Sequence, residues 1–199
     1  MNKIAIDVVL LPSPEVAKRA IQVSAELARV SGNTKIVLDD SRVLPHISLC
    51  MGVVDESDLP EVEHILNDVS EQFDALTLEV QGPVAVPIPT NERIAVLPIQ
   101  NTHALQQLHE TIMARLKHLI TEDAEREMFV EPHNVEQISC TWVNGYSEAA
   151  FFPHITVGFD EVNASGFPAQ FKATKLAVCH LGNYCTCRKK LFDLTLHEA

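Results

Sequence analysis

Long hydrophobic runs are absent from this chain of 199 residues. None approaches the roughly 18 apolar residues that a helix needs to cross a bilayer, so no membrane partner is expected. The apolar stretch near the N-terminus is interrupted by Asp7, and no small-residue cleavage site follows it. The sequence therefore shows no secretory signal, and we expect a cytoplasmic protein.

Cysteine is also scarce, with five residues, an odd number. Such a count does not indicate a disulfide framework, and a reducing cytosol is the simplest compartment for it. Cys179-His180 and the nearby Cys185 and Cys187 suggest a zinc motif. However, structural zinc usually requires ligand pairs with about two to four intervening residues, and here only one intervenes. The sequence therefore predicts no metal site and no cofactor, and the cysteines are expected to be buried in strands.

Basic residues are few, with 15 Lys and Arg against 27 Asp and Glu, for a net charge of −12. This balance argues against a protein that coats long nucleic acids, because such proteins usually carry a basic face. The charge is uneven, since residues 166–199 have five basic and two acidic side chains. That end could hold a small anionic ligand, or its charges could simply solvate the surface. A Gly-rich phosphate loop is also absent, which argues against ATP use through a P-loop.

Apolar periodicity predicts a chain of strands and helices in which a strand, a helix and a second strand occur twice. In the first half, strands are expected at residues 4–11, 36–38, 46–54 and 76–80, with helices beginning near Ser13 and Ser57. In the second half, strands are expected at residues 94–99, 154–159, 171–180 and 189–196, with a helix capped by Asn101-Thr102. The acidic segment 121–150 is expected to be an insertion or loop. We expect residues 1–199 to form one two-lobed domain.

Each half contains a Pro-His-Ile-hydroxyl motif, whose histidine begins the predicted strand 46–54 in the first half and 154–159 in the second. The motifs are Pro45-His46-Ile47-Ser48-Leu49 and Pro153-His154-Ile155-Thr156-Val157. Residues two apart on a strand point to the same face, so each His can act with its hydroxyl on one ligand. A third His-x-Thr, beginning at His109, falls on a predicted helix, where residues two apart diverge. His109 is therefore expected to be a solvated helix residue.

Two histidines suit the cleavage of a phosphodiester. The reaction removes a proton from the attacking oxygen and gives one to the leaving oxygen, and an imidazole with a pKa near 6.5 can do either. The hydroxyls of Ser48 and Thr156 could donate to the non-bridging oxygens, where charge gathers. A single motif of this kind is most simply a strand entry with a packed imidazole. Two copies at corresponding places instead favour a shared catalytic or phosphate-binding site with His46 and His154 as the catalytic pair.

The paired motifs resemble the His-x-Ser/Thr signature of the two-histidine phosphoesterase superfamily, which includes 2′-5′ RNA ligase-like proteins and 2′,3′-cyclic phosphodiesterases. The resemblance covers most of the chain. It implies a bilobal, pseudo-two-fold α+β fold in which two antiparallel sheets face a central cleft with helices outside. It implies metal-independent hydrolysis of 2′,3′-cyclic or 2′-5′ phosphodiester bonds, with both motifs lining the cleft. It also implies that His154 activates water and His46 protonates the leaving oxygen, although the reverse assignment is nearly as plausible.

Further side chains could contact the substrate. Arg42 could meet a phosphate or be an ordinary surface arginine, and Phe152 could stack on a base or pack in the core. Tyr184 is another stacking candidate. The expected partner is a nucleotide or an RNA terminus with a cyclic or 2′-5′ phosphate, without an extended nucleic-acid surface, and a monomer is expected. Two other functions remain open: a non-catalytic, AMP-like nucleotide-binding module that uses the same cleft, and an RNA end-joining activity.

Overall fold

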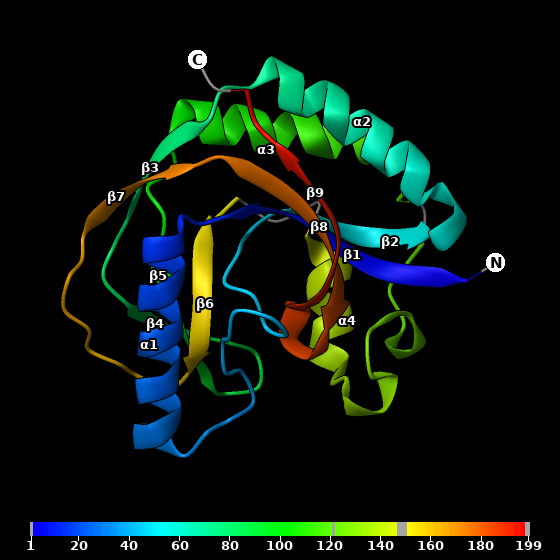
Figure 1. The fold of residues 1–199 in the computed structure, drawn as a ribbon. Helices are drawn as coiled ribbons and strands as arrows, with labels where there is room; N and C mark the ends of the chain where they lie inside the picture. The colour runs from blue at the N-terminus through cyan, green and yellow to red at the C-terminus, as the bar shows by residue number, and fades with distance from the viewer. Residues whose placement is uncertain (1, 121, 147–150, 198–199) are drawn as a thin grey trace.

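The computed structural model describes residues 2–120, 122–146 and 151–197. Four α-helices and nine strands are present in these ranges, and every pairing between the named strands is antiparallel (Figure 1). The predicted α+β class is confirmed. None of the helices in these ranges combines the length and the apolarity that a membrane span requires.

A four-stranded sheet in the order β2-β1-β8-β9 carries the first histidine motif. Helix α3 packs against β2, helix α2 packs against β9, and the two helices contact each other above the sheet (Figure 1). We call this sheet with α2 and α3 the first lobe, and the sheet that carries the second motif, with α1, the second lobe. The elements of the first lobe are β1 (Lys3–Leu11), β2 (Ile47–Asp55), α2 (Leu59–Gln72), α3 (His103–Leu116), β8 (Lys175–Gly182) and β9 (Thr186–Thr195).

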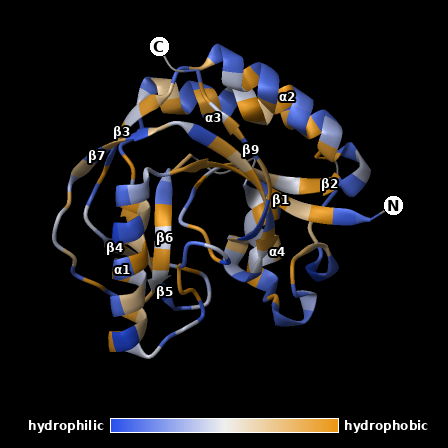
Figure 2. Ribbon diagram, in the orientation of Figure 1, coloured by the Kyte–Doolittle hydropathy of each residue, from blue (hydrophilic) through white to orange (hydrophobic). Residues whose placement is uncertain are grey.

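A three-stranded sheet in the order β4-β5-β6 carries the second motif. Helix α1 (Pro14–Ser31) packs against β6, along which hydrophobic and more polar residues alternate (Figure 2). A separate pair, β3 with β7, touches this sheet through a bridge between Val80 and Ile99. The strands are β3 (Leu76–Val80), β4 (Val84–Pro87), β5 (Arg93–Pro98), β6 (His154–Phe159) and β7 (Ala169–Ala173).

The predicted helix boundaries of α1 and α3 follow from their caps. The Ser13 hydroxyl accepts from the backbone N–H of Val16, and Gly32 ends the helix in the left-handed conformation with φ 71°. The Thr102 hydroxyl accepts from the backbone N–H of Leu105 at the start of α3. Both arrangements satisfy backbone groups that a helix end leaves unpaired.

Two predictions of local structure were wrong, and one strand was not predicted. Residues 36–38 form no strand, although Ile36 and Leu38 are buried. The strand expected at residues 171–180 is divided into β7 and β8, with Thr174 between them. Strand β4 was not predicted at all.

The segment expected to be an insertion or loop, 121–150, contains an unpredicted helix, α4 (Gln137–Gly145), preceded by two 3-10 turns. The α4 sequence is rich in residues with weak helix propensity, so tertiary contacts must favour the helix. Cys140 and Val143 are buried, and the Ser139 hydroxyl donates to the side chain of Asn183 at 2.9 Å. Residues 121 and 147–150 of this segment lie outside the described ranges.

The two motif strands share one irregularity. In the pairing of β1 with β2, Val9 is opposite Ser48 and Val8 is opposite Cys50, so Leu49 is an extra residue. In the pairing of β5 with β6, Thr156 and Gly158 are likewise opposite consecutive residues, with Val157 as the extra one. A bulge of this kind bends a strand and redirects its side chains. Its occurrence after both hydroxyl residues indicates that the two lobes build the motif in the same way.

Gly158 is required at the second bulge. Its φ is 148°, and a Cβ there would lie 2.9 Å from Leu27 Cδ2 and 3.4 Å from the Ile36 carbonyl oxygen. We expect Gly158→Ala to lower the free energy of unfolding by about 1–3 kcal/mol, because the new side chain adds backbone strain and a clash. Urea unfolding would measure this loss. The control is Gly145→Ala, where a Cβ meets nothing within 4 Å; equal stability of the two variants would contradict the prediction.

Candidate active site

One cavity of about 380 Å³ lies between the lobes and is lined by both histidine motifs. His46 and Ser48 enter it from the first lobe, and His154 and Thr156 enter it from the second. In each motif the proline, isoleucine and final apolar residue are buried, whereas the histidine and hydroxyl are partly exposed. The apolar residues therefore anchor the strand while the polar ones face the cavity. Its volume is typical of a site for a small organic ligand.

Both imidazoles are held by the same backbone contact. His46 Nδ1 lies 2.7 Å from the carbonyl oxygen of Leu44, and His154 Nδ1 lies 2.7 Å from the carbonyl oxygen of Phe152. A carbonyl can only accept, so Nδ1–H must be the donor in each contact. The proton on Nδ1 fixes the neutral tautomer and leaves Nε2 as the nitrogen that can take up or release a proton.

Burial alters the proton affinity of both histidines. It lowers the pKa of His46 to about 4, against the raising effect of the Leu44 carbonyl, and the neighbouring His154 lowers it further. Burial also lowers the pKa of His154, opposed by the Phe152 carbonyl. Both imidazoles line one cavity, where a positive charge on His154 disfavours a positive charge on His46. The lowered pKa values keep both imidazoles mainly neutral near pH 7, so an imidazole that is to donate a proton needs additional support.

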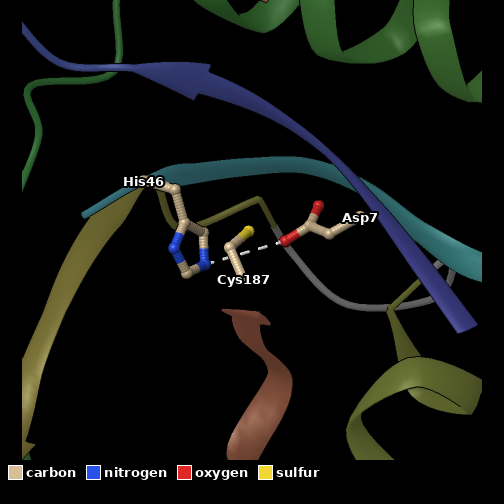
Figure 3. Close-up of side chains that lie close together, drawn as sticks. All are labelled: Asp7, His46 and Cys187. Atoms are coloured by element: carbon tan, nitrogen blue, oxygen red, sulfur yellow. Dashed lines mark ion pairs between the residues drawn. The ribbon is translucent and has the colours of Figure 1, made fainter. Parts of the chain in front are cut away.

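Asp7 on β1 lies beside His46 (Figure 3). Its side chain is fully buried, its Oδ2 accepts from the Ser48 hydroxyl at 2.6 Å, and the same oxygen lies 3.9 Å from His46 Nε2. Burial raises the pKa of the Asp7 carboxyl well above its usual range, against the lowering effect of the Ser48 hydrogen bond. Sequence reasoning noted Asp7 only as an interruption of the apolar run. A charged residue in the middle of a buried strand was the signal that could have identified it.

Asp7, His46 and Cys187 also form the one group of possible metal ligands found among the described residues (Figure 3). Their ligand atoms lie within 4.8 Å of one another. Carboxylate, imidazole and thiolate are all zinc ligands. However, Asp7 and Cys187 are fully buried and do not line the cavity, and Asp7 Oδ2 is already occupied by Ser48. We therefore assign no metal site to this group.

The two predicted stacking residues both line the cavity but differ in exposure. Phe152 is 51% exposed and stacks on the His154 ring at 5.1 Å. Tyr184 is buried, with φ 55°, and its hydroxyl donates to Glu136. Burial and that hydrogen bond raise the pKa of Tyr184 to about 12. Phe152 thus offers a half-exposed ring beside His154, whereas Tyr184 forms part of the buried wall.

His109 is not the solvated helix residue that was predicted. It is half-buried, lines the same cavity, and donates from Nδ1 to the Leu49 carbonyl oxygen at 2.7 Å. Its ring stacks on Phe151 with the centroids 4.0 Å apart. Helical periodicity contained the signal, because His109 follows the buried Leu105 by one turn.

Arg42 lies outside this cavity. It lines a second cavity of about 290 Å³, which shares Ile36 and Thr186 with the first. Its side chain is largely exposed, and its Nε lies 3.7 Å from an Asp39 carboxylate oxygen. Only a ligand that extends beyond the first cavity could reach it.

Solved structures share this fold at low sequence identity. TT0787 of Thermus thermophilus superposes with a TM-score of 0.66 at 15% identity, and the match covers 98% of this chain and 99% of that one. Escherichia coli LigT complexed with NADP+ gives 0.59 at 14% identity, covering all of both chains. LigT complexed with 3′-AMP gives 0.58 at 13% identity, covering 98% and 99%. Identities this low establish the fold alone.

The sequence itself is informative at the level of the family. No curated protein matches it. Residues 12–180, which include both histidine motifs, match the family described as the 2′-5′ RNA ligase superfamily. The chain therefore belongs to the 2′-5′ RNA ligase superfamily of two-histidine phosphoesterases.

Proposed function

We propose that this protein is a metal-independent phosphodiesterase that hydrolyses 2′,3′-cyclic or 2′-5′ phosphodiester bonds of nucleotides or RNA ends. The observation that carries the proposal is the matched pair of imidazoles. His46 and His154 each donate from Nδ1 to a backbone carbonyl and enter one cavity from opposite lobes. Membership of a phosphoesterase superfamily supports it. So do the complexes of LigT, a protein of the same fold, with 3′-AMP and NADP+.

The chemistry follows from this geometry. One imidazole removes a proton from water through Nε2 as the water oxygen attacks phosphorus. The other gives a proton to the ribose oxygen as its bond to phosphorus breaks. Histidines on opposite sides of the phosphate suit an in-line displacement, and each correctly placed proton transfer contributes about 10²–10⁴-fold. The hydroxyls of Ser48 and Thr156, beside the imidazoles, donate to the non-bridging oxygens.

The remaining cavity side chains suit a nucleoside. The exposed ring of Phe152 is positioned to stack on a base beside His154. Such stacking contributes about 1–3 kcal/mol per base and tolerates any base. Tyr184 forms part of the cavity wall, with its ring packed edge-on against that of Phe159. Arg42 contacts a phosphate only when the ligand continues into the second cavity, as a nucleotide chain does.

The direct test is incubation of the purified protein with 2′,3′-cyclic nucleotides and 2′-5′ dinucleotides in excess EDTA. We expect a monophosphate product from the cyclic substrates, or release of a nucleoside from the dinucleotides, at a rate unaffected by chelation. No step in the scheme needs a metal, because the imidazoles supply both proton transfers. Chromatography of the products gives the rate and the bond that is opened.

Two results would contradict the proposal. Turnover that disappears with EDTA and returns with a divalent cation would exclude the metal-independent scheme. Binding of nucleotide without turnover of any cyclic or 2′-5′ substrate would instead support a nucleotide-binding module.

A further inference from the structure

The two lobes support their histidines unequally. The matching bulges make Ser48 equivalent to Thr156, and the residue two pairs further along β1 is Asp7, opposite Met51. The equivalent residue on β5 is Ile94, opposite Phe159. A buried carboxyl therefore lies beside His46, whereas an apolar side chain occupies the matching place in the lobe of His154. The imidazoles have the same backbone contact but different chemical neighbours.

The surroundings of Asp7 do not suit a lone carboxylate. The side chain is fully buried, and Oδ1 has no hydrogen-bond partner among the described residues. A buried ionised carboxylate with an empty oxygen is unfavourable unless a cation or a proton compensates for it. Within reach, the compensating group is the His46 imidazole, whose Nε2 lies 3.9 Å from Oδ2. Ser48 donates to Oδ2, but its hydroxyl carries no charge.

We propose that Asp7 and His46 hold one proton between them in the resting protein, and that Asp7 thereby keeps His46 able to act as the proton donor that the family resemblance implies, with His154 as the base. This inference rests on the proposed function and deepens it. Asp7 acts through His46 and is therefore a positioning residue. At 3.9 Å Asp7 Oδ2 and His46 Nε2 form an ion pair and no direct hydrogen bond, so the proton rests on one group or the other and is on His46 Nε2 when a substrate oxygen enters the cavity.

The proton count is consistent with this assignment. Burial lowers the pKa of His46 to about 4 and raises the pKa of the Asp7 carboxyl. Taken alone, His46 would have no proton to give near neutrality. Taken as a pair, the two groups keep one proton over a wide pH range, and it belongs to neither alone.

None of the other titratable groups described near Asp7 and His46 takes the place of Asp7 as the partner that shares a proton with His46. Cys50 on β2 and Cys187 on β9 are buried thiols, and burial raises the pKa of each. Burial likewise raises the pKa of Tyr146, whose hydroxyl donates to the Ser48 carbonyl oxygen at 2.9 Å. These groups are neutral near pH 7. His154 is the remaining neighbour, and it disfavours charge on His46.

The step balances. Water loses a proton to His154 Nε2 and its oxygen bonds to phosphorus, while the bond from phosphorus to the leaving ribose oxygen breaks. That oxygen takes the proton from His46 Nε2, which leaves the Asp7–His46 pair as a carboxylate and a neutral imidazole. The proton on His154 returns to the pair through solvent after the product leaves.

The test is the pH dependence of kcat in Asp7→Asn, which keeps an acceptor for Ser48 but cannot carry the shared proton. We expect kcat at pH 7 to fall by about 10²–10⁴-fold, the contribution of one proton-transfer group, with KM nearly unchanged. The alkaline limb of the profile should move to lower pH, because His46 alone loses its proton near pH 4. The control is Asp55→Asn, since Asp55 also has an unpartnered buried Oδ1 among the described residues but lies at the far end of β2. Its profile should match the wild type.

A profile for Asp7→Asn with the wild-type alkaline limb would overturn the inference, even if its rate were lower. A second measurement uses spectra of the wild-type protein alone, without substrate and without any variant. At pH 7 the resting wild-type protein should show either the infrared band of a protonated carboxyl or the ¹⁵N signal of a His46 imidazolium. A carboxylate together with a neutral imidazole would refute proton sharing. One shared proton without any turnover would refute the proposed function instead.

Discussion

Replacing either histidine of the cavity with alanine is expected to abolish most of the phosphodiesterase activity. We expect His46→Ala and His154→Ala each to lower kcat for a 2′,3′-cyclic nucleotide by about 10²–10⁴-fold. The physical reason is that each variant removes one of the two proton transfers while the walls of the cavity remain. Nucleotide affinity, measured by calorimetry, should change far less than kcat.

The losses of kcat in His46→Ala and His154→Ala should not be additive. When two groups act in one concerted step, removing the second costs little once the first is gone, so the double variant should be about as slow as either single one. His180→Gln is the control, because His180 is another histidine whose pKa burial lowers, and its Nε2 donates to the Met128 carbonyl oxygen outside the cavity. Its kcat should stay near the wild-type value. Full activity in either alanine variant would remove the basis of the proposed function.

Removing the hydroxyl of Thr156 or of Ser48 is expected to cause the next largest losses of kcat, and the two losses should differ. We expect Thr156→Val to lower kcat by about 10²–10³-fold, as for the loss of one donor to the developing charge. Ser48→Ala should cost less, because in the resting protein the Ser48 hydroxyl already donates to Asp7 and must turn to reach the phosphate. Steady-state kinetics with KM and kcat determined separately would resolve the difference.

Thr141 provides a matched control for the hydroxyl pair. It lines the same cavity from α4, and its hydroxyl donates to the Gln137 carbonyl oxygen within the helix. Thr141→Val should therefore leave kcat unchanged. A loss with Thr141→Val equal to that with Thr156→Val would mean that any polar wall of the cavity serves, and the specific role of Thr156 would be rejected.

The regular elements could be predicted where local signals agree. The alternation of β6, the caps of α1 and α3 and the apolar run of β1 are all properties of neighbouring residues, so the sequence shows them directly. Helix α4 gave no such signal. Its residues favour helix weakly, and its burial against Asn183 and Tyr184 depends on a strand junction more than 40 residues away in sequence.

The residues of the candidate site were likewise predictable only in part from the sequence. The repeated His-x-hydroxyl motif identified four cavity residues, because two positions on one strand share a face whatever the rest of the fold does. The motif could not identify His109, whose helix had to pack on β2 before the ring reached the cavity. Nor could it place Arg42, whose position depends on an irregular segment with no periodicity.

Patterns a few residues long were enough to define the class of the fold, the family and the four side chains of the paired motifs. The meeting of His46 and His154 in one cavity is instead a property of the folded chain, since 108 residues separate them. So is the difference between the lobes, in which Asp7 lies beside one histidine while Ile94 takes the matching place beside the other. The reason is physical: which side chains meet across two lobes is set by strand register and bulges, and these depend on the packing of the whole chain.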